Sequence, residues 1–128
     1  MMAKNVFRNV FKVASFRESF NIALQGIIYL FLYHRNMRII FLSGIAAFLA
    51  GLHFKLTGIE LIALCVTITL VFMAEIFNTA VELMMDMLTE KYHTKIRLIK
   101  DIAAGVVFLA ALNSIAVGYI LFARKIFR

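Results

Sequence analysis

The run from residue 102 to residue 123 constrains this chain most, because its 22 positions hold no charged side chain. A helix of about 20 apolar residues crosses the hydrocarbon core of a bilayer. Residues 39–54 and residues 61–74 are also free of Asp, Glu, Lys and Arg. Allowing for polar ends, the three stretches predict transmembrane helices over residues 37–55, 61–86 and 101–123.

The composition favours a membrane protein that is almost entirely helical. The 128 residues are 63% hydrophobic, with a mean hydropathy of +0.92, and include no Pro and only six Gly. Pro and Gly interrupt helices most strongly, so their scarcity favours helix through most of the chain. A soluble bundle of this length could not cover so much apolar surface, so lipid must solvate part of it. We therefore expect an all-α membrane protein with one domain over residues 1–128.

Residues 4–33 are amphipathic rather than uniformly apolar. Apolar side chains recur at helical spacing from Val6 to Leu32, whereas most of the charged side chains fall on another face. A basic amphipathic helix of this kind lies in the membrane interface. Its charges interrupt any long apolar stretch, so we do not expect a signal peptide here.

The net charge of +7 is concentrated at the ends of the apolar stretches. Six Lys or Arg residues lie within the first 38 residues, four lie in residues 87–100, and one lies in the turn at residues 53–60. By the positive-inside rule, the N-terminus and the basic connection predicted over residues 87–99 face the cytoplasm, although three basic residues near the C-terminus oppose this orientation. The pattern suits anionic lipid headgroups, and no nucleic-acid partner is expected.

Four polar side chains, Glu75, Asn78, Glu82 and Asp86, form an acidic stripe on the second span. At 100° per residue these positions lie within roughly 80° of one another. An ionisable residue inside a membrane costs about 2.5–3.5 kcal/mol and persists where it pairs or binds something. Pairing with a basic residue such as Lys100 explains Asp86 well. It explains Glu75 poorly, because Glu75 lies roughly 16 Å inward, where carboxylates indicate a bound divalent cation or a transferred proton.

Lys100 and Asp101 stand at the start of the third span. A lysine beside a helix N-terminus favours an anion site, although a lysine reaching the surface and a capping carboxylate fit the same residues. With the acidic stripe, this pair indicates phosphoryl transfer to or from a lipid. The chain has neither a P-loop nor a kinase-type Gly-rich loop, so side chains and helix ends must hold any nucleotide. An ion or proton conductor would also use an acidic stripe, but it needs no phosphate-binding lysine.

The same residues resemble the signature of the small prokaryotic diacylglycerol kinase and undecaprenol kinase family. The resemblance rests on EIFNTAVE with Asp86, on Tyr92-His93, and on KDIAAG at residues 100–105, and it extends over residues 16–122. It implies a homotrimer with three transmembrane helices and one interfacial helix per chain, in the plasma membrane of a prokaryote. The implied activity is the phosphorylation of a membrane lipid alcohol by ATP with Mg²⁺, at the cytoplasmic surface.

The resemblance also implies a role for each site residue. Glu75 corresponds to the general base that takes the proton of the lipid hydroxyl, Asn78 orients the reacting groups, and Glu82 binds the metal. A carboxylate in a low-dielectric site is a stronger base, which suits the first of these roles. The residues implied to bind the nucleotide are Arg17, Tyr92, His93, Lys100 and Asp101.

The chain departs from the family pattern at His34, where a second metal-binding glutamate usually stands. Imidazole suits Zn²⁺ better than Mg²⁺, so His34 is a candidate ligand, with Zn²⁺ as the alternative metal. The residues around Asn78 and Lys100 look more like those of undecaprenol kinases, so undecaprenol is the expected substrate and diacylglycerol is the alternative. The change at His34 leaves a weak or non-catalytic homologue as a further alternative.

Overall fold

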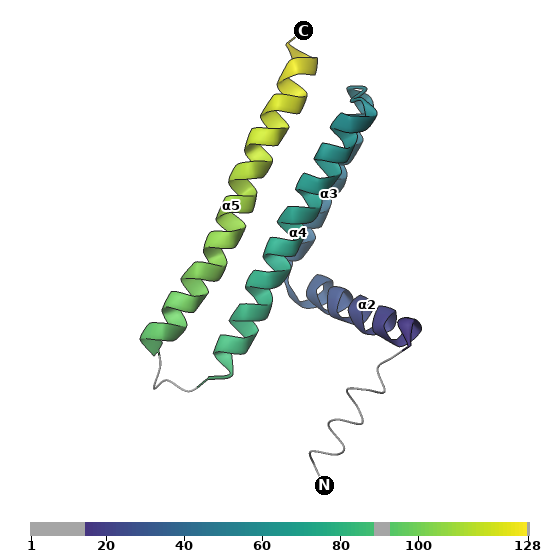
Figure 1. Ribbon diagram of the computed structural model, residues 1–128. Helices are drawn as coiled ribbons and strands as arrows, with labels where there is room; N and C mark the ends of the chain where they lie inside the picture. The colour runs from purple at the N-terminus through teal and green to yellow at the C-terminus, as the bar shows by residue number, and fades with distance from the viewer. Residues whose placement is uncertain (1–14, 89–92, 128) are drawn as a thin grey trace. The chain divides into compact units, whose positions relative to one another are not determined.

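A computed structural model describes residues 15–88 and 93–127 of the chain. They form the helices α2 (Phe16–Tyr33), α3 (Arg35–His53), α4 (Gly58–Asp86) and α5 (His93–Ile126), drawn in Figure 1. The prediction of an all-helical fold is therefore confirmed for the described residues. The chain divides into two units between Arg35 and Asn36, and each unit is described by itself.

Three of the helices, α3, α4 and α5, are long and apolar enough to cross a membrane, as predicted. Their most apolar windows have mean hydropathies of 1.4, 2.2 and 2.2. Only 11%, 22% and 6% of the residues in these windows are buried within the chain. Most of the apolar surface of the spans must therefore be covered by lipid or by other protein.

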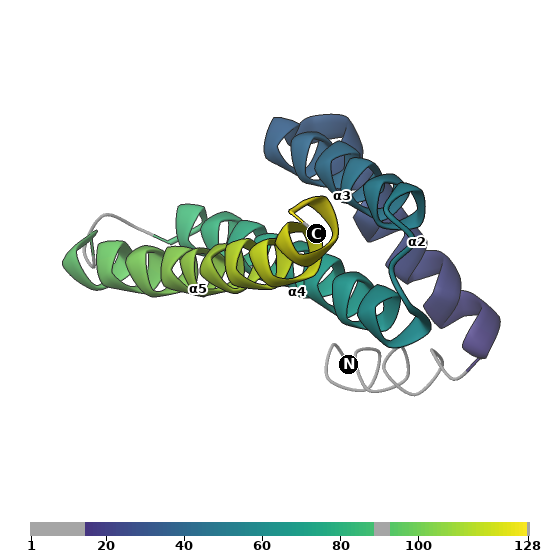
Figure 2. The same cartoon turned by 90° about the horizontal axis from the view of Figure 1, so that it is seen from above.

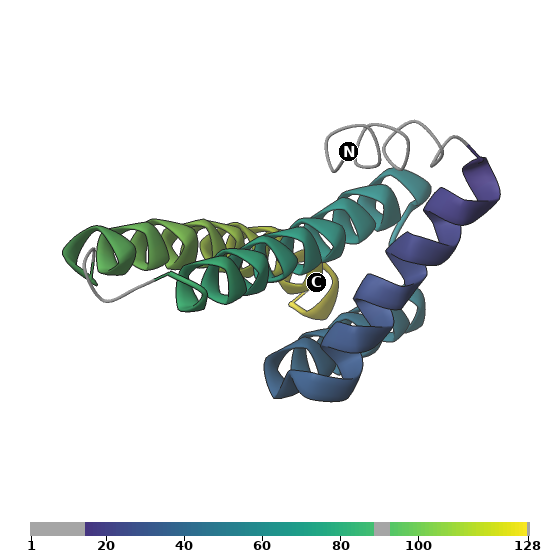
Figure 3. The same ribbon diagram turned by 90° about the horizontal axis from the view of Figure 1, so that it is seen from below.

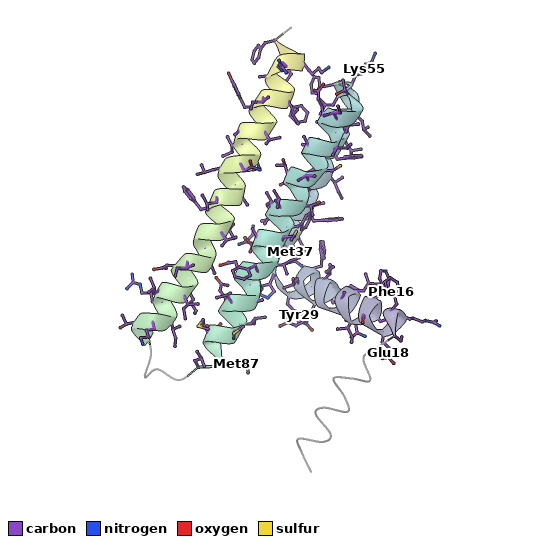
Figure 4. All side chains as sticks on the ribbon, viewed as in Figure 1. Phe16, Glu18, Tyr29, Met37, Lys55 and Met87 are labelled. Carbon is purple, nitrogen blue, oxygen red and sulfur yellow. The ribbon has the colours of Figure 1, made fainter. Side chains whose placement is uncertain are left out.

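Helix α2 begins at Phe16 because Ser15 caps its N-terminus. The Ser15 hydroxyl accepts a hydrogen bond of 3.1 Å from the main-chain N–H of Glu18, three residues later, which is capping-box spacing. Most apolar side chains of α2 are exposed within the chain, as an interfacial helix requires. Figure 4 labels Phe16 and Glu18 at the start of α2 and Tyr29 near its end. The predicted interfacial helix began earlier, and its residues 4–14 lie outside the described residues.

Helix α3 ends in a Schellman turn. The main-chain N–H of Leu56 donates to the carbonyl oxygen of Gly51 at 3.0 Å, and the N–H of Lys55 donates to that of Leu52 at 3.2 Å. This pattern places Lys55 in the left-handed position that glycine usually occupies, and its φ is 58°. The backbone of the turn is therefore satisfied internally, although Lys55 is strained.

Helix α4 begins immediately after this turn because Thr57 caps it. The Thr57 hydroxyl accepts from the main-chain N–H of Glu60 at 3.3 Å and lies 3.0 Å from the Glu60 carboxylate, to which it donates. This reciprocal pairing is a capping box, and it holds Glu60 in the first turn of α4. Figure 4 labels Lys55, in the turn before α4, and Met87, directly after α4.

Helices α4 and α5 run antiparallel and lie side by side, as Figures 1 and 3 both show. Helix α5 begins at His93, so the basic polar connection predicted over residues 87–99 is wrong from His93 onward. Charge suggested a loop there, but Lys, Arg, Leu and Ile are all tolerated in helices, and no Gly or Pro interrupts the segment. The basic residues of this segment therefore extend the third span.

The main core of the second unit lies beside the α3–α4 turn. Leu56, Leu64 and Leu121 form a buried cluster supplied by the turn, α4 and α5. A Cβ atom at Gly51 would lie only 2.9 Å from Cδ2 of Leu64, so glycine allows α3 and α4 to approach closely here. We call this end of α3–α5 the turn end, and the end with Asp86 and Lys100 the acidic end. Figure 2 views the same helices from above.

Candidate functional site

The acidic stripe lies on the second half of α4, which is one uninterrupted helix. Glu75 is buried, with an exposed fraction of 7%, and Asn78 is half-buried. Glu82 is exposed, and the side chain of Asp86, the last residue of α4, is 63% exposed. The stripe therefore leads from a carboxylate that the chain shields to carboxylates that remain accessible.

Asn78 and Glu82 are joined by a hydrogen bond across one turn of α4. The amide nitrogen Nδ2 of Asn78 donates to Oε1 of Glu82 at 3.4 Å. The other amide atom, Oδ1 of Asn78, is buried and has no hydrogen-bond partner among the described residues. A buried acceptor left in this state costs free energy, so it is suited to a donor or cation supplied by a bound molecule.

Other polar side chains of α4 differ from the stripe because they are satisfied inside the helix. The hydroxyl of Thr67 donates to the carbonyl oxygen of Ala63, and that of Thr69 donates to the carbonyl oxygen of Cys65, both at 2.8 Å. Such bonds to the preceding turn explain threonine in an apolar span without any ligand. The unsatisfied oxygen of Asn78 has no comparable structural explanation.

Lys100 approaches the stripe from α5. Its Nζ lies 2.8 Å from Oδ1 of Asp86, and the two side chains are 38% and 63% exposed, respectively. The pairing anticipated for Asp86 is therefore observed. An exposed ion pair contributes little to stability, so its main effect is to hold the ammonium group beside the end of α4. Asp101, the next residue, is exposed.

The remaining predicted site residues are not brought to this cluster by the described geometry. Arg17 is exposed in the first turn of α2, and His34 follows α2, where its main-chain N–H donates to the carbonyl oxygen of Leu30 at 2.9 Å. Both belong to the first unit, which is described separately. Tyr92 lies outside the described residues. His93 is the first residue of α5, and its side chain also lies outside the description.

The donor atoms of the stripe suit Mg²⁺ better than Zn²⁺. Among the described residues, no three His, Cys, Asp or Glu side chains come together to hold a metal. Mg²⁺ is commonly held by one or two carboxylates together with substrate phosphates, so it does not require a cluster of three protein ligands. The carboxylate of Glu82 and the unsatisfied oxygen of Asn78 are hard oxygen donors of the kind that Mg²⁺ takes.

A second acid–lysine pair, which we did not predict, lies at the turn end. Nζ of Lys125 on α5 lies 3.8 Å from Oε1 of Glu60 on α4. The capping-box spacing of Thr57 and Glu60 is visible in the sequence and could have placed Glu60 in the first turn of a helix. The partner on α5 depends on the register of the α4–α5 pair, which the sequence alone does not show.

Comparison with known proteins identifies the family. Residues 21–122 match the family described as prokaryotic diacylglycerol kinase. A diacylglycerol kinase of Synechocystis sp. is 36% identical over 117 residues, which cover 90% of this chain and 67% of that protein. An undecaprenol kinase of Bacillus subtilis is 32% identical over 92 residues, covering 72% of this chain and 75% of that protein. No solved structure matches the chain. The chain therefore belongs to the prokaryotic diacylglycerol kinase family and is a lipid kinase of the membrane.

Proposed function

We propose that this chain phosphorylates the free hydroxyl of diacylglycerol with ATP, using Glu75 as the general base. The observation that carries the proposal is the burial of Glu75 within an apolar helix, on the face that also bears Asn78 and Glu82. A buried carboxylate in a membrane helix is costly, and it is retained where it has chemistry to perform. In this family of lipid kinases, that chemistry is the removal of the proton from the lipid hydroxyl.

The reaction is a direct, in-line transfer. The hydroxyl oxygen of the lipid attacks the γ-phosphorus of ATP, the new O–P bond forms, and the bond to the β–γ bridging oxygen breaks to release ADP. The hydroxyl proton passes to the carboxylate of Glu75. A base shielded from water accepts such a proton more readily, and positioning of the two reactants supplies much of the remaining catalysis.

Asn78, Glu82 and Lys100 position and neutralise the phosphates. Bound Mg²⁺ would be held by the Glu82 carboxylate, with the Asn78 oxygen as a second donor, and would supply positive charge to the phosphates. Asn78 keeps the Glu82 carboxylate oriented through the 3.4 Å hydrogen bond. Lys100 exchanges its contact with Asp86 for a phosphate oxygen, which an exposed ammonium group can do with little reorganisation.

The predicted site residues outside this cluster, together with Asp101, keep their predicted roles in the proposal. Arg17, Tyr92, His93 and Asp101 remain our proposed nucleotide contacts, and His34 remains a proposed metal ligand in addition to Glu82 and Asn78. We also propose one lipid-kinase domain over residues 1–128, a homotrimer, and a cytoplasmic acidic end. The trimer is supported by the large share of each span that the chain itself leaves uncovered, and the orientation by the distribution of Lys and Arg.

Diacylglycerol is favoured over undecaprenol, which reverses our expectation from the sequence. The relative named diacylglycerol kinase is 36% identical and aligned over 90% of this chain, whereas the relative named undecaprenol kinase is 32% identical over 72%. The second match is also substantial, so undecaprenol is the second candidate substrate. Both lipids offer a primary hydroxyl on long apolar chains, and a site within the membrane can accept either.

The test is phosphorylation of the two lipids side by side by the full chain in mixed micelles with MgATP. We expect the larger kcat/KM with diacylglycerol, and a larger value with undecaprenol would make the second candidate correct. Glu75→Gln should lower kcat by about 10²–10⁴-fold, as expected for loss of a general base, while ATP binding is retained. Glu18→Gln, the same substitution at an exposed carboxylate of α2, is the matched control.

Two further outcomes would count against parts of this mechanism. Turnover of neither lipid by folded protein would contradict the kinase proposal, and an unchanged rate in Glu75→Gln would remove Glu75 from the base role.

A separate substitution tests the metal site. If the metal site has lost a ligand at His34, then His34→Glu should raise the Mg²⁺-dependent rate. A lower rate would instead indicate that the imidazole of His34 itself contributes.

A further inference from the structure

A charged cavity lies at the turn end, away from the acidic stripe. Its volume is about 460 Å³, and it is lined by Glu60, Ala123, Arg124, Lys125 and Phe127. The basic residues come from the last turns of α5, and Glu60 comes from the first turn of α4. None of these residues takes part in the phosphoryl transfer proposed above.

The charges lining this cavity favour an anion. Arg124 and Lys125 face a single lining carboxylate, that of Glu60, so the lining carries a formal excess of one positive charge. The Glu60–Lys125 contact is long, at 3.8 Å, and Glu60 also accepts a hydrogen bond from the Thr57 hydroxyl at 3.0 Å. Lys125 is therefore loosely paired, and Arg124 is exposed.

The apolar part of the cavity indicates where that anion comes from. Phe127 is 86% exposed, and Ile126 beside it is 53% exposed. Basic side chains at the end of an α-helix also interact favourably with the helix dipole, but that interaction requires neither a cavity nor an exposed aromatic ring. Cations at the end of an apolar span with uncovered apolar side chains beside them match a phospholipid, whose phosphate is attached to acyl chains.

We propose that the cavity formed by Glu60 and the basic end of α5 binds the phosphate of an anionic membrane phospholipid. This lipid is bound at the opposite end of the α4–α5 pair from Lys100, so it lies in the other leaflet from the lipid that is phosphorylated. Arg124 and Lys125 contact its phosphate, while Phe127 lies against its acyl chains. The site also accounts for basic residues at an end of the chain where the positive-inside rule disfavours them.

The test uses the absence of Trp from the sequence. In the full chain, Phe127→Trp introduces a single indole at the cavity, and brominated lipids quench its fluorescence on contact. The protein is reconstituted in phosphatidylcholine vesicles with increasing brominated phosphatidylglycerol, and separately with brominated phosphatidylcholine. We expect phosphatidylglycerol to associate roughly fivefold more strongly, the preference that one basic residue near a membrane supplies.

Three substitutions in this background separate the site from general charge effects. Arg124→Gln should remove most of the preference for phosphatidylglycerol, whereas Arg97→Gln, at an exposed position of α5 near the acidic end, should leave it intact. Glu60→Gln should increase the preference, because it removes the carboxylate that competes with the lipid phosphate. An increase cannot arise from a disrupted fold, and the helical content of each variant is checked by circular dichroism.

Equal quenching by the two lipids in the parent protein would overturn the proposal. So would an equal loss of preference in Arg97→Gln and Arg124→Gln, because the effect would then reflect net charge alone. Dissolved inorganic phosphate is the last arm of the experiment. If millimolar phosphate abolishes the preference, the cavity binds a free anion rather than a lipid, and the assignment to a phospholipid is wrong.

Discussion

The two ends of the α4–α5 pair carry the same chemical groups in different surroundings. At each end an acidic residue of α4 meets a lysine of α5: Asp86 meets Lys100, and Glu60 meets Lys125. The distance is 2.8 Å at the acidic end and 3.8 Å at the turn end. The pair at the acidic end is also more exposed, so a short ion pair here does not reflect deeper burial.

What separates the ends is the environment around each pair. At the turn end, Glu60 belongs to a helix cap and lies near the buried cluster of Leu56, Leu64 and Leu121. At the acidic end, the polar groups continue inward along α4 as far as the buried Glu75. An acid–lysine pair at the end of a membrane helix is therefore not in itself a catalytic site. The inward series of polar groups is the feature on which we base the proposed catalytic site at the acidic end.

The largest expected difference between the two acid–lysine pairs tests whether chemistry is confined to the acidic end. Lys100→Met should lower kcat for lipid phosphorylation by about 10²–10³-fold, because a preorganised cation no longer faces the transferred phosphate. Lys55→Met, at an exposed lysine of the turn end, should leave kcat unchanged. Radiolabelled ATP in the mixed-micelle assay measures both rates, and similar losses in both variants would show that the two ends do not differ in catalytic role.

The next largest effect tests whether the close approach of α3 to α4 at the turn end stabilises the fold. Gly51→Val should destabilise the fold by about 1–3 kcal/mol, because its side chain would overlap the leucines that line the approach of α3 to α4. Gly118→Ala on α5 is the control, since its added Cβ would meet no atom within 4 Å apart from the adjoining residues and backbone of its own helix. That substitution should stabilise its helix by about 0.5–1 kcal/mol. Unfolding by sodium dodecyl sulfate in mixed micelles, followed by circular dichroism, gives both values.

The smallest effect concerns strain within the same turn. Lys55→Gly should stabilise the protein by about 0.5–1 kcal/mol, because glycine adopts a φ near 58° without the steric cost that other residues meet. Lys55→Ala loses the same charge and keeps the strain, so it should show no gain in the same unfolding measurement. Equal stability of the two variants would mean that the left-handed conformation of Lys55 costs nothing.

Much of this arrangement could be predicted from the sequence. The three apolar stretches gave three membrane-spanning helices, because segments without charge and without Pro have few alternatives in lipid. The common face of Glu75 and Glu82 follows from helical periodicity, as does the contact between Asn78 and Glu82, four residues apart. The pairing of Asp86 with Lys100 was among the expected alternatives because both flank one connection.

The errors have physical reasons too. The segment 93–99 was expected to be a loop because it is charged, but charge alone does not end a helix. The interfacial helix predicted over residues 4–33 is described only from Phe16 onward, so its earlier part stays a prediction. The contact of Glu60 with Lys125 could not be predicted from the sequence, because it depends on the axial register of α4 against α5.

The four residues from Phe54 to Thr57 that join α3 to α4 also determine how the chain can enter a bilayer. A connection so short ties the two helices together, so they insert as a pair and the turn crosses the hydrocarbon in one passage. The N–H groups of Phe54, Lys55 and Leu56 all donate to carbonyl oxygens of α3. Main-chain groups that are already bonded need not give up water on the way, which removes a cost of several kcal/mol for each. The charged side chains carried across with the turn are those of Lys55 and Glu60, and their desolvation sets the barrier to inserting this pair.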